Sequence, residues 1–312
     1  MLYSYCTGFC LSLLLSIGLL QTAFAQNELI CDGENHLVEY NGSYQDFIIP
    51  DDPTILQIEL TAKGGDGGFA DLDNGCKSIG GEGASLSAVF NIGTGANEIP
   101  PGSVIRFVVG QAGEKGTAQA VLGTGFTYGG GGGGTGVLYK ALNSDEWIIL
   151  GVAGGGGGAY QGSIVGFCVD NENGQGGRAE TSGGHGNGDI AVGAGGENGN
   201  GGSASFEISA GGGGAFSPGE GVICIEIIGT IEVGEGQAGY PEGGAGGESE
   251  GCFSFTFRDG GFGFGAGGAG IGAGGGGGGY SGGGGGGTTG RGGGGGSFIV
   301  DWAADQSITA GD

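Results

Sequence analysis

The chain has 312 residues, 90 of them glycine, and a formal net charge of −25 at pH 7. It contains only eight lysine and arginine residues for phosphate contacts, so the composition excludes an electrostatic nucleic-acid-binding protein. A charged partner is expected to be basic, although acidity also serves to keep a glycine-rich surface soluble. Collagen is excluded too, because the glycines follow no strict three-residue period and there are only six prolines.

The N-terminus has the pattern of a secretory signal peptide. Residues 9–20 are almost entirely apolar, and Ala23-Phe24-Ala25 places small residues at the two positions that signal peptidase recognises. A membrane anchor is the alternative, but the apolar run is short for a span. We therefore predict cleavage of residues 1–25 before Gln26. The mature chain is expected to be secreted or at the cell surface, without a membrane span.

Short runs of β-type sequence alternate with glycine along the mature chain. They are rich in Val, Ile and Phe, and most are bounded by glycine or turn residues. They lie at residues 47–50, 54–62, 84–92, 103–109, 146–153, 205–209, 222–228 and 297–300. We predict a mainly β protein with no significant α-helix, composed of an N-terminal leader segment (26–46) and one glycine-rich domain (47–312).

The mature chain keeps five of the seven cysteines. They are Cys31, Cys76, Cys168, Cys224 and Cys252. Their wide spacing lacks the C-x-x-C pairs of zinc sites. In an oxidising compartment one or two disulfides are expected, with the pairing left open. The odd cysteine is then unpaired or bonded to another chain.

The longest glycine tracts have similar lengths and are separated by single Tyr, Ser, Thr or Ala residues. They cover residues 129–134, 154–158, 211–214, 274–279, 282–287 and 292–296. Disorder is the alternative, but apolar residues make up 37% of the chain and would be left in solvent. Polyglycine can form extended helices with three residues per turn and no internal hydrogen bonds, which must bond to neighbours. We predict a bundle of such helices, about 16 to 19 Å thick, with Tyr280 capping one end.

The tracts and their flanking strands resemble the glycine-rich extracellular domain of the anaplastic lymphoma kinase and leukocyte tyrosine kinase receptors. The similarity lies in GAGGGGGGYSGGGGGG (272–287) followed by GGGGGSFIV (292–300). Stretches that agree in order are GASLSAVFNI (83–92) with SVIRFVVGQAGE (103–114), GGGGGGTGVLYK (129–140) with WIILGVAGGGGGAY (147–160), and GGFGFGAGG (260–268). The resemblance spans about residues 47 to 300. It implies a polyglycine-helix bundle, with tracts mainly in 129–296, joined to a tumour-necrosis-factor-like β-sandwich, with strands mainly in 47–153.

The resemblance also carries functional expectations. In the receptors this unit binds small basic protein ligands, and similar domains in exported bacterial proteins look like surface or adhesive modules. This chain has no kinase motif and no room for a kinase domain. It stops at Asp312, soon after residues 297–300, where the family adds a polar loop and a closing N-G-x-V-x-I strand. Either the domain is C-terminally incomplete or its last strand is supplied otherwise.

No catalytic, cofactor-binding or metal site is predicted. Nucleotide-binding glycine patterns carry no information in polyglycine, and there is no G-K-[ST] sequence or helix to support them. His36 and His185 are isolated and are expected to be solvated or locally bonded loop residues. No Ser or Cys lies in a nucleophile motif.

Three short segments suggest other chemistry. DLDNG (71–75) and DNENG (170–174) alternate oxygen ligands as calcium loops do, but neither has the distal Glu, and Asx turns have the same pattern. Calcium is therefore the one cofactor that the sequence suggests. For both segments, calcium binding is the weaker interpretation and an Asx turn is the stronger one. Asn41-Gly42-Ser43 is a glycosylation sequon, meaningful in a host that glycosylates secreted proteins.

Two functional interpretations follow. The first is a secreted or cell-surface structural, adhesive or protein-binding module without catalysis. The alternative is the ligand-binding ectodomain of an anaplastic-lymphoma-kinase-type receptor that stops before its membrane span and kinase. The sequence beyond Asp312 would distinguish them.

Overall fold

The computed structural model describes residues 27–118, 124–190, 192–205, 208–226, 229–248, 258–270 and 272–312. The predicted signal peptide lies outside them. The described residues contain 17 β-strands and no helix, which confirms the predicted mainly β fold for this part of the chain. In the same residues there is no helix with the length and apolarity needed to cross a membrane.

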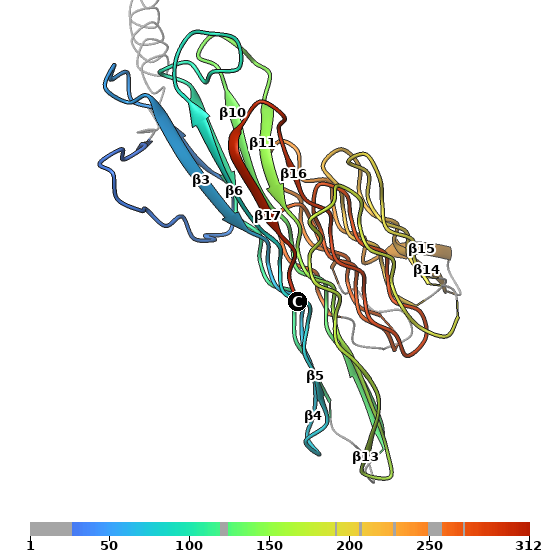
Figure 1. Ribbon diagram of the computed structural model, residues 1–312. Helices are drawn as coiled ribbons and strands as arrows, with labels where there is room; N and C mark the ends of the chain where they lie inside the picture. The colour runs from blue at the N-terminus through green and yellow to red at the C-terminus, as the bar shows by residue number, and fades with distance from the viewer. Residues whose placement is uncertain are drawn as a thin grey trace, which may run out of the picture.

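Two sheets packed face to face form a β-sandwich at one end of the elongated molecule (Figure 1). The larger sheet has the order β1 (Asn27–Glu28), β2 (Gln45–Ile48), β7 (Val104–Val108), β10 (Thr135–Lys140), β11 (Ile148–Ala153) and β16 (Phe298–Ile299). The smaller sheet has the order β17 (Ala304–Thr309), β6 (Ser85–Asn91) and β3 (Gln57–Lys63). The predicted leader segment, 26–46, therefore contributes β1 and the first residues of β2 to the larger sheet.

Alternating side chains produce the core of this sandwich. Strand β3 has the sequence QIELTAK, and every second residue is buried while its neighbours are exposed. Its partner β6 follows the same two-residue period, so both strands direct one face toward the larger sheet. The enclosed side chains include Ile58, Leu60, Phe90, Ile105, Val137 and Leu150. Each such burial contributes about 1.5 to 3 kcal/mol.

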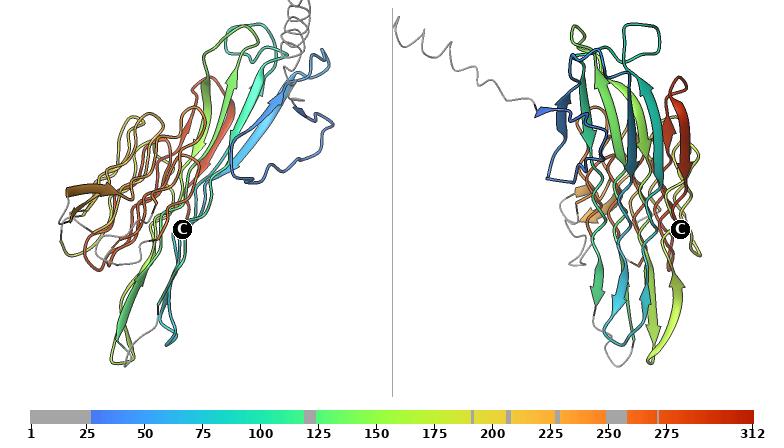
Figure 2. Two further views of the ribbon diagram at one scale, coloured as in Figure 1. Left: turned by 180° about the vertical axis from the view of Figure 1, so that it is seen from behind. Right: turned by 60° about the vertical axis from the view of Figure 1, so that its left-hand side comes forward.

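A second pair of small sheets forms an arm at the opposite end of the molecule (Figures 1 and 2). One sheet has the order β13 (Phe167–Glu172), β12 (Tyr160–Ile164) and β9 (Gly125–Tyr128). The other has the order β5 (Lys77–Ser78), β4 (Ala70–Leu72) and β8 (Gly116–Ala118). We call these two sheets and their turns the arm.

The glycine tracts run side by side next to the larger sheet, with the hairpin of β14 (Val222–Glu226) and β15 (Gly229–Val233) beyond them (Figure 1). The N–H groups of residues 274–279 bond to three neighbouring segments in turn and return to the same segment at every third residue. Gly274 and Gly277 donate to Gly290 and Gly293, Gly275 and Gly278 to Gly129 and Gly132, and Gly276 and Gly279 to Ala210 and Gly213. The N···O distances are 2.8 to 3.3 Å. A three-residue period is the signature of polyglycine II packing, so the predicted bundle is present.

The carbonyl groups of this central tract bond to three further segments. Gly155 and Gly158 donate to Gly278 and Gly275, Gly283 and Gly286 to Gly277 and Gly274, and Gly267 to Gly276. The tract is thus enclosed by six hydrogen-bonded neighbours. A Cβ atom at Gly277 would lie 2.9 Å from the Gly156 carbonyl oxygen and 3.0 Å from the Gly155 carbonyl carbon, and closer still to the Gly155 oxygen. Glycine is required here because the backbones themselves form the core.

Arg106 connects the larger sheet to the glycine region. Its guanidinium binds both carboxylate oxygens of Asp46 at 2.8 Å. It lies between the rings of Tyr44 and Trp147, at 3.6 and 4.0 Å from their centroids. It also donates to the Pro241 carbonyl oxygen at 3.3 Å. The same face of the sheet buries Val108, Leu138, Val152 and Phe264, so the larger sheet is covered on both sides.

The structure corrects three expectations about where elements lie. The run 205–209 was expected to be a strand, but its described residues form only a bridge between Ser205 and Ser209. Residues 304–309, for which no strand was predicted, form β17 and pair with β6. The polar sequence ADQSIT does not predict a strand, because its side chains are mostly exposed and lack the apolar alternation of a core strand.

The bundle also extends beyond residues 129–296. Gly64–Gly68, Gly80–Gly83 and Gly311 bond into it, as in the Gly65 N–H donating to Gly133 O at 2.8 Å. The sequence analysis assigned only the long glycine tracts to the bundle. In these shorter segments the glycines are interrupted by Asp66 and Glu82, whose side chains are exposed, and Asp66 Oδ1 accepts a hydrogen bond from the Gly83 N–H at 2.9 Å.

Candidate functional site

The structure brings one pair of the predicted cysteines together. Cys76 and Cys168 form a disulfide between the two sheets of the arm. Cys31 is exposed and has a free thiol, and partial burial followed by the carboxylates of Asp32 and Glu28 raises its pKa. For Cys224 the structure describes only the backbone, in β14, and Cys252 lies outside the described residues.

Both histidines are locally bonded loop residues, as expected. His36 Nε2 lies 2.8 Å from Asp32 Oδ1, and His185 Nδ1 accepts a hydrogen bond from the Gly195 N–H at 3.3 Å. The His36 hydrogen bond is the first cause of a lowered pKa at Asp32. The partner of the His36 ring in these bonds is a carboxylate, and that of the His185 ring is a backbone N–H group.

The two calcium-like segments both belong to the arm: 71–75 covers the end of β4 and the turn after it, and 170–174 covers the end of β13 and the two residues after it. Amide oxygens of both segments bond to the protein. Asn74 Oδ1 accepts from the Cys76 N–H at 3.1 Å, and Asn173 Oδ1 accepts from the Ile79 N–H at 3.0 Å. Asp71 lies 3.7 Å from the Lys77 ammonium. Among the residues that the structure describes, no group of three or more His, Cys, Asp or Glu side chains could hold a metal ion.

Asn41 lies in an exposed turn, as its sequon requires. Its Oδ1 accepts a hydrogen bond from the Ser43 N–H at 3.2 Å, and Gly42 has φ +99°. Tyr280 stacks on Phe298 with ring centroids 4.6 Å apart, and Phe216 packs edge-on against it. Its N–H donates to the Gly296 carbonyl oxygen, and its ring packs in the apolar cluster of Val108, Leu138 and Val152 on the larger sheet, so its predicted role as a cap of the bundle stays a prediction.

A shallow cavity of about 500 Å³ lies near the N-terminal segment. Its walls include Tyr40, Phe262, Glu114, Glu248 and Asp259. Glu114 is already engaged there, because its carboxylate accepts bonds from Arg258 and from the Asp259 N–H.

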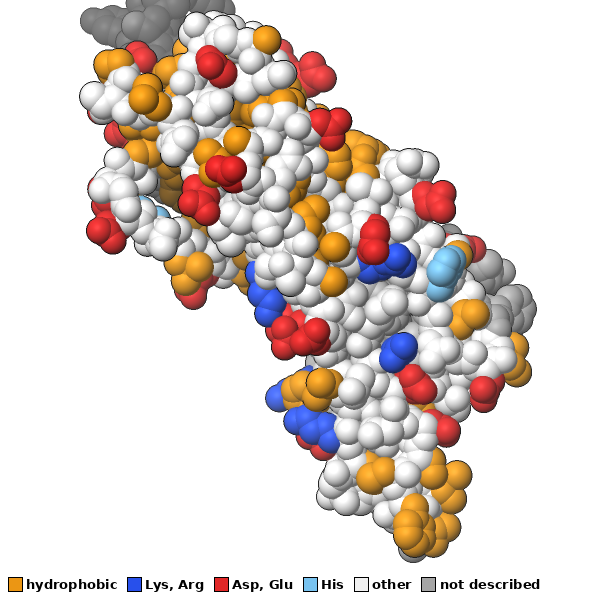
Figure 3. Space-filling model, viewed as in Figure 1, with side chains coloured by type: hydrophobic (Ala, Val, Ile, Leu, Met, Phe, Trp, Pro, Cys, Tyr) orange, Lys and Arg blue, Asp and Glu red, His pale blue; other side chains and the backbone are white. Residues whose placement is uncertain are grey.

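The exposed end of the arm is the clearest candidate for a binding site. Four apolar side chains gather there, and we call them the apolar tip: Phe126, Ile164, Val165 and Phe167. Their exposed fractions are 47%, 55%, 71% and 75%. Figure 3 shows this group of hydrophobic side chains at the far end of the arm. Apolar patches of this kind on soluble proteins mark interaction sites.

A two-residue turn between β12 and β13 presents the tip. Ile164 pairs with Phe167, and Val165 and Gly166 form the turn with φ of 53° and 81°. Such turns favour Asn-Gly, and a β-branched residue at positive φ is a conformational outlier. The chain therefore holds Val165 outward at a cost in backbone strain. Strained residues of this kind concentrate at functional sites.

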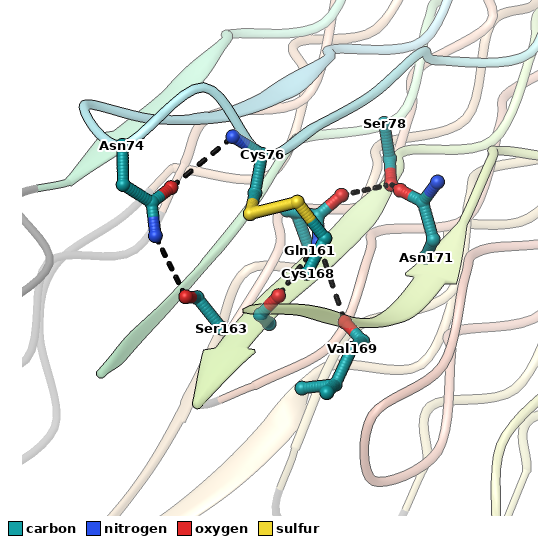
Figure 4. The surroundings of a disulfide bond; sticks show 9 residues. Asn74, Cys76, Ser78, Gln161, Ser163, Cys168, Val169 and Asn171 are labelled. Carbon is teal, nitrogen blue, oxygen red and sulfur yellow. Dashed lines mark hydrogen bonds between the residues drawn. A yellow bond between two sulfur atoms is a disulfide. The ribbon is translucent and has the colours of Figure 1, made fainter. Parts of the chain in front are cut away.

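The disulfide and a group of polar side chains make the arm rigid behind its tip (Figure 4). Asn74 donates to Ser163 Oγ at 2.7 Å, and Ser78 donates to Asn171 Oδ1 at 2.6 Å. Ser78 also bonds to Oε1 of Gln161, which is fully buried. These contacts join the 70–78 segment to β12 and β13, so both sheets of the arm hold the turn.

Charge near the tip is negative. The segments 69–80, 115–128 and 160–173 contain four carboxylates, Asp71, Asp73, Asp170 and Glu172, against two cations, Lys77 and Lys115. Burial, followed by the Asp170 carboxylate, raises the pKa of Tyr160 to about 12. The negative charge of Asp170 on β13 therefore affects the ionisation of Tyr160 on the neighbouring strand β12.

Comparison with other proteins adds no relative. The chain matches no protein-family model, and no curated protein is significantly similar to it. The resemblance to the receptor domain stays a prediction that depends on the order of the motifs.

Sequence reasoning missed the apolar tip and Arg106. A usable signal was SIVGFC (163–168), in which three bulky apolar residues flank a glycine in a tight turn. A turn of that kind on the surface is normally polar. Arg106 gave no signal, because its partners Tyr44 and Asp46, Trp147, and Pro241 come from three segments far apart in the sequence.

Proposed function

We propose that this protein is a secreted or cell-surface, non-catalytic binding module whose arm presents the apolar tip to another protein. The single observation that carries the proposal is the exposure of four bulky apolar side chains at the end of an arm held by a disulfide. An unused hairpin end would normally be polar and flexible.

The rest of the molecule suits a scaffold. The centre of the bundle consists of hydrogen-bonded backbone, and the sandwich encloses an apolar core. Both provide rigid support, and sites on rigid elements hold their geometry better than sites on loops. The predicted leader and the disulfide agree with an oxidising, extracellular location.

The test is binding of the purified, fluorescently labelled protein to the surface of the cells that produce it. The double variant Ile164→Ser/Phe167→Ser should bind at least about 30-fold more weakly, as expected for loss of a central apolar anchor. Leu142→Ser is the matched control, because Leu142 is 71% exposed but lies on the β10–β11 turn in the sandwich.

Melting temperatures of all three proteins should agree, since the substituted side chains are exposed. Equal binding by the tip variant and the control would exclude the tip as the contact site.

A second variant distinguishes the effect of the rigid arm on binding from the effect of the apolar side chains themselves. Cys76→Ser/Cys168→Ser keeps every tip side chain but removes the covalent link between the two sheets of the arm and leaves them joined by hydrogen bonds alone. Weaker binding by this variant, at an unchanged bundle stability, would show that the tip must be held in place. Unchanged binding would limit the requirement to the apolar side chains.

A further inference from the structure

The charges around the apolar tip carry information about its partner. Asp170 follows Cys168 by two residues on β13, and its side chain is exposed. Asp73 is also exposed, on the turn that the disulfide joins to β13. The cations beside the arm are engaged by its own side chains: Lys77 is 3.7 Å from Asp71, Lys77 and Lys115 lie over the Phe69 ring, and Arg291 is 3.8 Å from Glu172. The tip is therefore an apolar surface with an acidic border.

The shape of the tip limits what can cover it. Val165 and Phe167 project from a tight turn and are more than two-thirds exposed, so the surface is a protrusion. Protruding aromatic and aliphatic side chains contribute most to affinity when they fill a desolvated pocket on the partner. The partner surface must then be concave and apolar at its centre.

A second copy of this chain cannot provide a basic border. Of its eight cations, Lys63, Lys77, Arg106, Arg178, Arg258 and Arg291 lie within 4.0 Å of carboxylates. The other two, Lys115 and Lys140, lie over the rings of Phe69 and Trp147. With a net charge of −25 per chain, two copies repel each other, and so do the chain and an anionic bilayer.

We infer that the apolar tip inserts into an apolar pocket bordered by lysine or arginine side chains on a partner protein. The inference rests on the proposed function and adds the chemistry of the partner. Complementary charge around an apolar centre speeds encounter and fixes the orientation of docking.

The experiment selects peptides from a random dodecapeptide library displayed on phage, with the wild-type protein as bait. Ile164→Ser/Phe167→Ser serves for counter-selection, so that the recovered peptides depend on the tip. We expect these peptides to combine aromatic or aliphatic residues with lysine or arginine, and their affinity to fall as salt rises from 50 to 300 mM.

Two matched substitutions test the acidic border directly. Asp170→Asn removes a charge near the tip, and Asp305→Asn removes one from β17. Both residues are exposed and have positive φ, 48° and 46°, which asparagine accepts readily. The selected peptides should bind Asp170→Asn about three- to tenfold more weakly and Asp305→Asn as tightly as wild type.

Each other result decides against part of the inference. Tip-dependent peptides that lack basic residues, or bind Asp170→Asn unchanged, would overturn the basic border and leave the proposed function standing. Recovery of no tip-dependent peptide would overturn both. Tip-dependent binding to phosphatidylcholine or phosphatidylserine vesicles, or tip-dependent dimers in sedimentation velocity, would replace the protein pocket with a lipid surface or a second copy.

Discussion

The β-sandwich and the glycine bundle lie side by side but are stabilised by different parts of the chain. In the sandwich, Leu60, Phe90 and Leu150 fill the space between two sheets. In the bundle, the equivalent space is filled by peptide groups that bond to neighbours on several sides. A side-chain core can relax around a smaller residue, whereas a lattice of backbones has no flexible group that could move aside for a larger one.

The energetic balance differs as well. A buried apolar side chain contributes about 1.5 to 3 kcal/mol, whereas a peptide hydrogen bond contributes a net 0.5 to 1.5 kcal/mol, roughly. Glycine also loses more conformational entropy on ordering than alanine, by about 0.5 to 1 kcal/mol per residue. The bundle is therefore stable only when nearly all of its bonds form together. We expect it to unfold as a unit and to be intolerant of substitution.

The largest effect is expected from Gly277→Ala in the central tract. The new Cβ would overlap the Gly155 carbonyl oxygen, and the surrounding backbone cannot move without breaking further bonds. We expect a loss of at least about 4 to 5 kcal/mol, the range of exceptional single substitutions. The measurement is chemical denaturation followed by circular dichroism.

Gly166→Ala in the arm turn is the control for this prediction. Nothing lies within 4 Å of a Cβ there, so only the positive φ of 81° is penalised, by about 1 to 2 kcal/mol. Equal losses at both positions would mean that the tracts are not packed as a lattice.

Leu150→Ala in the sandwich is expected to have the next largest effect. Leu150 is fully buried between the sheets, and its truncation should cost about 2 to 5 kcal/mol through lost burial and a cavity. Hydrogen exchange should show faster opening of β6 and β11 and little change for the amides of residues 274–279. Equal acceleration in both regions would show that the sandwich and the bundle unfold together.

Arg106→Met tests the connection between the two regions. It leaves the Asp46 carboxylate, one-quarter exposed, without its cation, and removes the stack between Tyr44 and Trp147. Loss of one partner from a buried pair costs about 3 kcal/mol.

Arg178→Met is the control for Arg106. Its partner Glu180 is 65% exposed, so the expected loss is below about 1 kcal/mol. Thermal melting of both variants and of Arg106→Met/Asp46→Leu, in which stability should partly recover, completes the test. Matching melting temperatures for the two single variants would exclude a stabilising role for the Arg106 cluster.

The smallest effect concerns the arm at alkaline pH. Burial and the Asp170 carboxylate raise the pKa of Tyr160 to about 12, so the folded state keeps this proton where the unfolded chain, with an ordinary value near 10, loses it. Stability should be complete below pH 10 and should decline as the pH rises to 12, by about 1 to 3 kcal/mol. Tyr160→Phe should reduce this decline in urea denaturation at pH 9 and 11, and the part that remains is expected from Tyr128 and Tyr139, whose pKa values burial also raises. An unchanged pH dependence in the variant would mean that Tyr160 does not cause it.

Most strands of the sandwich, and the packing of the glycine tracts against one another, could be predicted from local sequence. The alternation in QIELTAK and SLSAVFN specifies strands with one buried face, and five- or six-glycine tracts can satisfy their peptide groups only by bonding to one another. Such patterns act over a few residues, so a single sequence contains them.

Tertiary structure alone decided the rest, because it joins residues that are far apart in the chain. The pairing of Cys76 with Cys168, 92 residues away, selects one of several disulfides that the spacing allowed. Strand β17 exists because β6 offers an open edge, and its own sequence has no apolar period. The apolar tip is exposed only because the arm projects from the body, and exposure is a property of the folded surface that no local pattern contains.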